Sequence, residues 1–367
     1  MRLLRIAFFL CIAAVLPLEG SAADTDAELD SLLRAAHQFV AREALTPPSA
    51  QAVESSVLKG YLHSVDVYST YLSPEEVRAM AAAKADGFVG VGMDVLQDAS
   101  GIVYCLPYPE SPAEKAGIRH GDILLSVEDT LVSAVPFVLL ESMVRGEKDS
   151  TVRLGVMGQN NTPRVLSIRR SPVTIPHVTV HRDGPFPRIR IFRFTEDTPG
   201  ALRNAMFQLR TPERLVLDLR GNPGGDMNAA VTCASLFLDA GNIVSILVNR
   251  EGQEEVRRAG QAADFRMPVA IWQDRFTASA AEVFIAAITR NGRGKSLGQR
   301  SFGKGLSQRA VGSGNGGVFI LTTAKLLQPD GEAYHGIGLE PDLIVSRSDN
   351  PEHDYFRRTH ESFGLRP

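Results

Sequence analysis

The N-terminal part of the chain shows the spacing of apolar positions that is typical of helices. Across residues 26–44 and 50–62, apolar side chains recur every three or four positions, which predicts two helices. Residues 70–74 then predict a loop that leads into a third helix, because Ser73 is a favourable N-cap and the proline after it fits the first helical position. The region 24–86 is therefore expected to be mainly helical.

From residue 87 the pattern changes to short runs that are typical of β-strands. Five such runs and two short helical patterns occupy residues 87–170, which predicts a small β-rich module. The β-like runs are Phe88–Val95, Ile102–Leu106, Ile123–Val127, Thr151–Val156 and Val165–Ile168. The helical patterns are Pro112–Gly117 and Pro136–Val144.

After Pro172 the chain alternates β-like runs with helical patterns. This alternation is typical of an α/β core, which we place at residues 171–346. The predicted strands are Arg188–Phe194, Leu215–Leu219, Ile243–Val248, Val269–Trp272 and Val318–Thr323, and the predicted helices are Pro199–Leu209, Met227–Asp239 and Ala280–Arg290. The pattern predicts no element over residues 347–367, which we interpret as a C-terminal tail.

The first 23 residues have the features of a secretory signal peptide. A basic start is followed by an apolar run from Ile6 to Leu18 and then by small residues at positions 20–23. This run is shorter than the roughly 20 residues that span a bilayer. We therefore expect export, most simply to a bacterial periplasm, with an uncleaved anchor in the inner membrane as the alternative.

Composition and charge narrow the function classes. The chain has 367 residues, of which 44% are hydrophobic and 22% charged, which excludes disordered and polytopic membrane proteins. Its formal charge of −3 provides no basic field for phosphates, so nucleic acid is not an expected partner. Cys105 and Cys233 lie singly in apolar stretches and are expected in the core. His177 and His181 lack a carboxylate cluster, so neither a metal nor a cofactor is expected.

The first motif with chemical content runs from Leu215 to Gly225. An apolar strand leads into a glycine-rich turn, and a helix is expected to begin near Met227. Glycines allow backbone N–H groups to point outward, and the N-terminus of a helix adds positive potential, so the turn suits a developing anion. An ordinary tight turn between strand and helix is the alternative.

The second motif places Ser279 between a buried strand and an amphipathic helix. A serine at a helix start is exposed where the helix dipole favours negative charge, which suits a nucleophile. The alternative is that Ser279 or Thr277 only caps the helix.

The third motif contains Lys304 between two glycines, with Phe302 and Leu306 nearby. A lysine in an apolar setting can lose its proton and serve as a base. A solvated surface lysine is the alternative.

Two other short motifs predict no site. Gly294–Gly298 matches the GxSxG pattern around Ser296, but it follows a helix instead of leading into one, so a nucleophile elbow is not expected. A phosphate loop ending at Ser296 would need a glycine at position 289, where the chain has threonine.

Together these motifs resemble those of the C-terminal processing peptidases, or tail-specific proteases, of family S41. The resemblance covers roughly residues 60 to 345, and Ser279 and Lys304 have the separation of that family's nucleophile and base. The matching segments are Tyr71–Glu75, Phe192–Thr198, Leu215–Gly225, Thr277–Glu282, Phe302–Gly305 with Gln308, Leu321–Ala324 and Gly336–Asp342. The resemblance implies an α/β (α+β) serine protease core with crotonase-like and ClpP-like ββα character, N-terminal helices and an inserted PDZ domain.

The β-rich module fits that implication, because its start resembles the carboxylate-binding loop of a PDZ domain. The implied peptide-binding residues are Phe88, Val89, Gly90, Val91, Gly92 and Met93. Such domains bind an extended peptide end by strand addition. Arg145 is a candidate regulatory contact, with a solvated charge as the alternative.

The resemblance also implies a mechanism. Ser279 attacks a peptide carbonyl, Lys304 takes its proton, and Gln308 orients the lysine amine. The backbone N–H of Ala280, with that of Gly224 or Gly225, stabilises the oxyanion.

The implied function is an exported serine endopeptidase that recognises substrate C-terminal tails, with an activating adaptor and a homo-oligomer as candidate partners. The alternatives are a non-catalytic PDZ scaffold that binds C-termini and a crotonase-like enzyme acting on a thioester. One departure from the family pattern, Gln299–Ser301 in place of an acidic residue and a threonine, is expected to affect the loop that carries Lys304.

Overall fold

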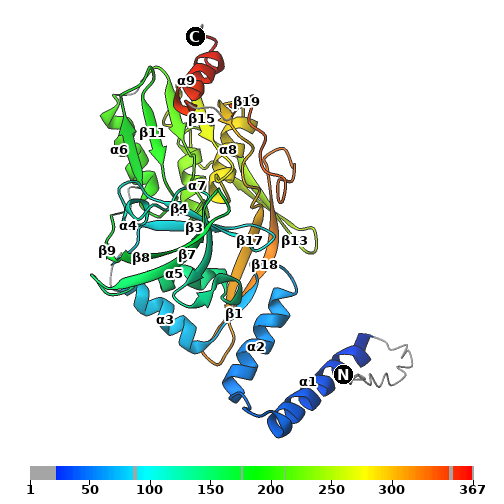
Figure 1. Ribbon diagram of the computed structural model, residues 1–367. Helices are drawn as coiled ribbons and strands as arrows, with labels where there is room; N and C mark the ends of the chain where they lie inside the picture. Colours follow the sequence, from blue (N-terminus) through cyan, green and yellow to red (C-terminus); the bar gives the residue numbers. More distant parts are fainter. Residues whose placement is uncertain (1–21, 86–88, 175–176, 211, 347–349, 366–367) are drawn as a thin grey trace, which may run out of the picture. The chain divides into compact units, whose positions relative to one another are not determined.

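The computed structural model describes residues 22–85, 89–174, 177–210, 212–346 and 350–365 (Figure 1). It divides into two units, residues 1–57 and 58–367, which are described separately. The first unit contains α1 (Ala22–Glu43) and the beginning of α2 (Ala50–His63), which confirms the two predicted N-terminal helices. No helix in the described ranges is both long and apolar enough to cross a membrane.

The centre of the second unit is a six-stranded sheet. Its order is β10-β11-β12-β15-β16-β19, and all neighbours are parallel except β10 and β11. The strands are β10 (Val178–His181), β11 (Arg188–Ile191), β12 (Leu215–Asp218), β15 (Val269–Gln273), β16 (Gly294–Gly298) and β19 (Leu343–Ile344). This sheet and its helices form the predicted α/β core.

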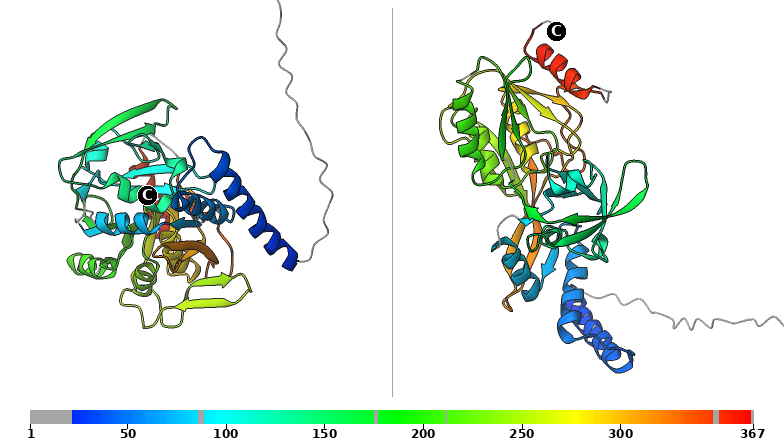
Figure 2. Two further views of the ribbon diagram at one scale, coloured as in Figure 1. Left: turned by 90° about the horizontal axis from the view of Figure 1, so that it is seen from below. Right: turned by 60° about the vertical axis from the view of Figure 1, so that its left-hand side comes forward.

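Both faces of the central sheet are covered, because successive residues of a strand point to opposite sides. Leu215 and Leu217 pack with α6 (Thr198–Gln208), α7 (Met227–Ser235) and α8 (Ala280–Arg290). Val216 instead packs with α9 (Pro351–Ser362). The layers can be followed in the further views of Figure 2.

A second sheet carries the strand that follows the lysine motif. Its order is β1-β18-β13-β14, and β17 also pairs with β18. The strands are β1 (Thr70–Leu72), β13 (Ile243–Asn249), β14 (Glu254–Arg258), β17 (Leu306–Gly312) and β18 (Val318–Leu327). The prediction of a loop at residues 70–72 is wrong, because these residues find their strand partner in the distant β18. The helix after them, α3 (Pro74–Ala85), has the predicted start, with Glu76 N–H donating to Ser73 Oγ at 3.2 Å.

A third sheet lies wholly within the predicted module, which we call the β-rich module (residues 89–170). Its order is β3-β4-β5-β7-β8, and β6 pairs with β5. The strands are β3 (Met93–Gln97), β4 (Val103–Pro107), β5 (Ile123–Val127), β6 (Thr130–Leu131), β7 (Thr151–Met157) and β8 (Pro163–Arg169). A 3-10 turn (Val132–Ala134), α4 (Pro112–Lys115) and α5 (Phe137–Val144) complete the module, and β2 (Val89–Gly90) pairs with β9 (Ser171–Pro172). Cys105 lies in its core, as predicted.

Several elements were not predicted from the hydrophobic pattern. Ser296 is a buried residue of the strand β16, where its Oγ and its N–H both bond to Asp342, so the GxSxG serine has a structural environment. The C-terminal segment forms α9, which is held by Trp272 Nε1–H donating to Thr359 Oγ1 at 2.9 Å.

Candidate active site

Ser279 lies in a sharp turn between a strand and a helix. The buried strand β15 ends at Gln273, and Ser279 is the N-cap of α8, whose residues from Ala280 to Ile288 are all buried. Ser279 has φ of 55° and ψ of −122°, which is unusual for a residue with a side chain. Backbone strain of this kind clusters at functional sites and costs about 1–3 kcal/mol.

The glycine-rich turn after β12 lies directly against Ser279. A Cβ on Gly224 would be 2.8 Å from Ser279 Cβ, so only glycine fits there. The N–H of Gly224 donates to Asn222 Oδ1 at 2.9 Å, and the Asn222 amide in turn donates to Ile191 O. Asn222 thus fixes the turn, and the N–H of Gly224 is engaged within it.

Two other N–H groups beside Ser279 are available. Within the described ranges, neither Gly225 N–H nor Ala280 N–H donates to a protein acceptor. Ala280 is the first residue of α8, where intrahelical acceptors are lacking. Of the three predicted oxyanion-hole residues, Ala280 and Gly225 therefore have free donors.

Glu282 joins the start of α8 to the loop that carries Lys304. Its carboxylate is fully buried and accepts the N–H groups of Ser279 and Lys304, each at 2.8 Å. It also accepts Gly303 N–H at 2.7 Å and the hydroxyl of Ser301. Burial raises the pKa of Glu282 to about 7, although these hydrogen bonds act in the opposite direction.

Ser301 connects the lysine loop to a third segment. Besides donating to Glu282, its Oγ accepts Leu339 N–H at 2.6 Å, and its side chain is buried. Ser301, which departs from the family pattern, is thus one of the residues that hold the loop carrying Lys304 in place.

Lys304 is enclosed by aromatic rings. Its Nζ lies 4.7 Å from the centre of the Tyr68 ring and 5.8 Å from that of Phe137 in α5. Burial lowers the pKa of Lys304, while the nearby carboxylates of Glu282 and Asp66 oppose this shift. The lysine therefore loses its proton more readily than a solvated one.

Gln308 lies on β17 near Lys304, but its side chain has another partner. Its Nε2 donates to Thr322 Oγ1 on β18 at 3.0 Å. Among the described residues, Lys304 Nζ makes no hydrogen bond to Gln308 or Ser279. The three predicted catalytic residues nevertheless line one pocket.

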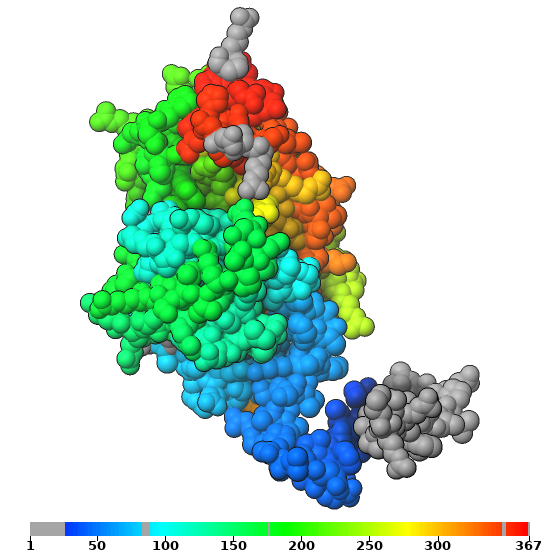
Figure 3. Space-filling model, in the orientation of Figure 1, coloured from blue at the N-terminus to red at the C-terminus, as the bar shows by residue number. Residues whose placement is uncertain are grey.

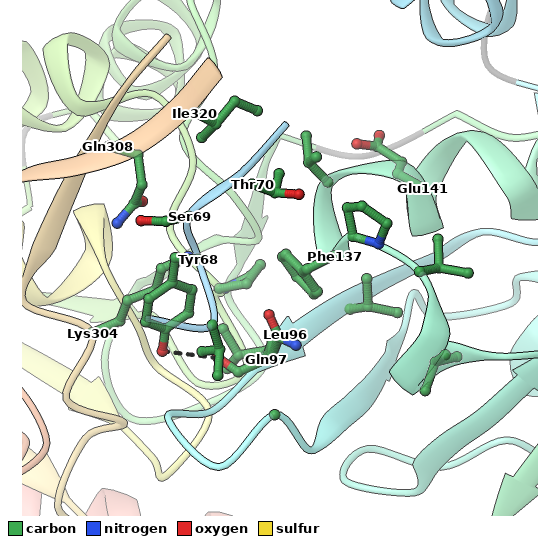
Figure 4. Close-up of a pocket in the computed structure, with 18 of the residues that line it drawn as sticks. Tyr68, Ser69, Thr70, Leu96, Gln97, Phe137, Glu141, Lys304, Gln308 and Ile320 are labelled. Atoms are coloured by element: carbon green, nitrogen blue, oxygen red, sulfur yellow. Dashed lines mark hydrogen bonds between the residues drawn. The ribbon is translucent and has the colours of Figure 1, made fainter. Parts of the chain in front are cut away.

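That pocket has a volume of about 760 Å³ and is lined by residues of both the core and the β-rich module (Figure 4). Ser279, Lys304, Gln308 and Gly225 line it from the core. The module contributes β3 from Met93 to Gln97 and α5, with Phe137 and Glu141. Figure 3 shows the cyan and green surface of the module adjoining the yellow and orange surface of the core.

The predicted carboxylate loop lies at the start of β3. Phe88 falls outside the described residues, and Val89 and Gly90 form β2. In the described part of the chain, the N–H groups of Val91 and Gly92 have no acceptor.

The candidate regulatory residue Arg145 lies beside this loop. A Cβ on Gly90 would be 3.7 Å from Arg145 Cγ. The Arg145 guanidinium also donates to Glu141.

The histidine pair set aside as a metal site lies apart from these residues. His177 bonds to Thr195, and His181 bonds to Thr179. Within the described ranges no group of three His, Cys, Asp or Glu side chains could hold a metal ion.

Sequence reasoning gave no role to Glu282 or Tyr68. Glu282 stands three residues after Ser279, the spacing of a capping box, which could have indicated its bond to the Ser279 N–H. Tyr68 carries no such signal, because its contact with Lys304 depends on distant segments.

The backbone at Ser279 leads to a stability prediction. Ser279→Gly is expected to exceed Ser279→Ala in free energy of unfolding by about 1 kcal/mol, because glycine adopts a positive φ without strain. Denaturant unfolding measures the difference. The same two substitutions at Ser142, inside α5, should give the opposite order. Equal stabilities of the two Ser279 variants would show that this turn is not strained.

Comparison with known proteins agrees with this architecture. The model for peptidase family S41 matches residues 188–345. The chain is 31% identical over 315 residues to a probable CtpA-like serine protease of Staphylococcus epidermidis, a match that covers 84% of this chain and 64% of that protein. It is also 31% identical over 337 residues to the carboxy-terminal processing protease CtpA of Bacillus subtilis, covering 90% of this chain and 72% of that protein.

Among solved structures, the chain is similar to the photosystem II D1 C-terminal processing protease. The TM-score is 0.73 at 27% identity, and the match covers 88% of this chain and 87% of that one. The predicted α/β protease fold is thus confirmed, and the chain belongs to the carboxy-terminal processing proteases of peptidase family S41.

Proposed function

We propose that this protein is a serine endopeptidase that binds the C-terminal tail of a protein substrate and cleaves the substrate at Ser279. The observation that carries the proposal is that Ser279 and Lys304 line the same pocket as β3 and α5 of the β-rich module. Two of the relatives named above, CtpA of Bacillus subtilis and the photosystem II D1 protease, are processing proteases by name.

Ser279 is the proposed nucleophile and Lys304 the proposed base. The neutral lysine amine takes the hydroxyl proton as Ser279 Oγ attacks the peptide carbonyl, and the proton then passes to the leaving amine. A water molecule, activated by the same lysine, hydrolyses the acyl-enzyme. The lowered pKa of Lys304 supports this role.

The proposed oxyanion hole consists of Ala280 N–H and Gly225 N–H. Both groups lie beside Ser279 with no acceptor among the described residues, whereas Gly224 N–H is bonded to Asn222. Each donor in such a hole typically contributes about 3 kcal/mol to transition-state stabilisation. Gln308 is proposed to orient the lysine, for which its side chain must exchange Thr322 for Lys304.

The β-rich module is proposed to be a PDZ domain that binds the tail along β3. Asp98 N–H donates to Ile102 O, and Tyr108 N–H donates to Gly92 O, so even-numbered residues of this segment face β4. Met93, Val95 and Gln97 therefore present their backbone groups to the opposite side, where no described strand pairs with β3. A peptide can add there as an antiparallel strand.

The tail carboxylate is proposed to bind at the beginning of β3. The N–H groups of Val91 and Gly92, which have no acceptor among the described residues, are suitable donors, and Arg145, whose guanidinium pairs with Glu141, lies beside Gly90. A substrate held there extends along β3 toward Gln97 and the pocket with Ser279.

Export is proposed on the sequence of the first 23 residues alone, with a bacterial periplasm as destination. An activating adaptor and a homo-oligomer likewise stay predictions.

The first functional prediction concerns the two reacting groups. Ser279→Ala and Lys304→Ala are each expected to reduce peptide hydrolysis to background, and the double variant should lose no more, because both residues serve one step. Turnover of an unstructured peptide with a free C-terminus measures this. Ser296→Ala is the matched control and should stay within about twofold, since a serine outside the site contributes no reacting group. Near-normal turnover in Ser279→Ala would refute the nucleophile assignment.

The second concerns pH. Activity is expected to rise with pH with an apparent pKa well below the usual lysine value of about 10.4, because only the neutral amine accepts the serine proton. The profile of kcat/KM measures this. His335→Asn, which changes a histidine packed against Gly305, should leave the apparent pKa of this profile unchanged. Disappearance of the pH dependence in this variant would indicate a histidine base.

The third concerns tail recognition. A peptide with a free C-terminal carboxylate should be cleaved with a higher kcat/KM than the same peptide with a C-terminal amide, because the amide removes the charge that the start of β3 binds. Steady-state kinetics on the matched pair measures the ratio. Equal rates in the wild-type enzyme would contradict tail recognition while leaving the assignment of Ser279 intact.

A further inference from the structure

Tyr68 lies in a segment whose backbone is fixed on both sides. Asp66 Oδ1 accepts the N–H groups of Tyr68 at 2.9 Å and of Ser69 at 2.8 Å. Ser69 is fully buried, and its Oγ accepts the N–H of Thr322 on β18 at 3.1 Å. The Tyr68 side chain therefore projects from a rigid attachment to the sheet that also carries Gln308.

The Tyr68 side chain contacts both the proposed catalytic base and the strand proposed to bind the tail. The ring covers Lys304 Nζ, with 4.7 Å from Nζ to the ring centre. The hydroxyl donates to the backbone oxygen of Gln97, at the end of β3, at 3.3 Å (Figure 4). Burial raises the pKa of Tyr68 to about 12, so the hydroxyl keeps its proton and acts as a donor at neutral pH.

The bond to Gln97 occupies a position that a substrate tail would use. Gln97 is one of the odd-numbered residues that face the unpaired side of β3, and it is the last before the turn at Asp98. If the C-terminal residue of a tail pairs with Met93, the residues two and four positions before it pair with Val95 and Gln97. The N–H of the fifth residue from the end would then compete with the Tyr68 hydroxyl for Gln97 O.

We propose that Tyr68 is a positioning residue that makes Lys304 respond to the length of the tail bound along β3. Without a tail, the bond to Gln97 holds the ring against Lys304 Nζ, and the amine has no hydrogen bond to Ser279 in the described structure. A tail with five or more residues in strand conformation displaces the hydroxyl, and the ring then releases the amine toward Ser279. This inference rests on the proposed function.

Tyr68→Phe tests the proposal because it keeps the ring and removes only the hydroxyl. Hydrolysis of an amidated peptide should rise by roughly two- to tenfold, the range that one neutral hydrogen bond supplies. Hydrolysis of the peptide with a free carboxylate should change little, so the ratio between the two substrates falls. A purely structural role would instead lower both rates together and leave the ratio unchanged.

Tyr71→Phe is the matched control. It makes the same chemical change three residues away, where the hydroxyl bonds to Asn315 and neither of these two residues is among those that line the pocket of Ser279. Its ratio should equal that of the wild type. An equal fall of the ratio in both variants, or no fall in Tyr68→Phe, would overturn the proposal.

Tail binding supplies an independent measurement. Fluorescence anisotropy of a labelled six-residue tail peptide should show tighter binding to Ser279→Ala/Tyr68→Phe than to Ser279→Ala, because the competitor for Gln97 O is gone. N-methylation of the fifth residue from the C-terminus should abolish that gain, whereas N-methylation of the fourth, whose N–H faces away from β3, should preserve it. Weaker binding to the double variant would show that Tyr68 supports the groove and would overturn the proposal.

Different outcomes test the proposed function and the role of Tyr68. Residual turnover in Ser279→Ala equal to the wild type would remove the proposed function itself. An inactive Ser279→Ala together with an unchanged ratio of free-carboxylate to amidated peptide hydrolysis in Tyr68→Phe would contradict only the proposed role of Tyr68.

Discussion

The buried carboxylate of Glu282 is the interaction on which the geometry of the candidate site depends. It accepts four donors, one from the residue at the start of α8 and three from the loop at residues 301–304. A carboxylate taken out of water is costly unless its oxygens are satisfied, so the two segments are held in the one arrangement that satisfies them. The position of Ser279 beside the loop of Lys304 thus depends on the carboxylate of Glu282.

The central sheet explains why the glycine turn and Ser279 meet. β12 and β15 are parallel neighbours, so the segments that follow them leave from the same edge of the sheet. Gly224 follows β12 and Ser279 follows β15, and the close contact between them leaves no space for a Cβ. The helices α6, α7 and α8 bury one face and α9 the other, which keeps this edge rigid.

The sequence predicted those parts of the structure that depend on local pattern. The strands β12 and β15 and the helix α8 are strongly apolar, and their positions match the prediction closely. β1 was missed because its three residues are a strand only through pairing with β18, and α9 was missed because it is rich in polar residues and is fixed by Trp272. Ser279 and Lys304 were predicted as site residues from their motifs, and the structure brings both to one pocket. The contact of Tyr68 with Lys304 was not found, because no spacing in the sequence brings these residues together.

The contacts between the β-rich module and the core make the module part of the site. Leu96, Leu106 and Tyr104 of the module form one hydrophobic cluster with Phe276, Ala278 and Phe302 of the core. Ala278 directly precedes Ser279, and Phe302 lies two residues before Lys304, so this cluster packs against the segments that carry both catalytic candidates.

A buried ion pair adds a second point of attachment. Arg193 Nη1 donates to Asp94 Oδ1 on β3 at 3.0 Å, and the Tyr108 hydroxyl donates to the same carboxylate. Burial raises the pKa of Asp94, and the Arg193 charge opposes that shift. Separating the two side chains would leave a buried charge without its partner, which is destabilising. The strand that would receive a substrate tail is therefore bonded to the core at Asp94 and to Tyr68 at Gln97. Because the Tyr68 ring lies against Lys304 Nζ, a displacement of β3 would also change the surroundings of Lys304.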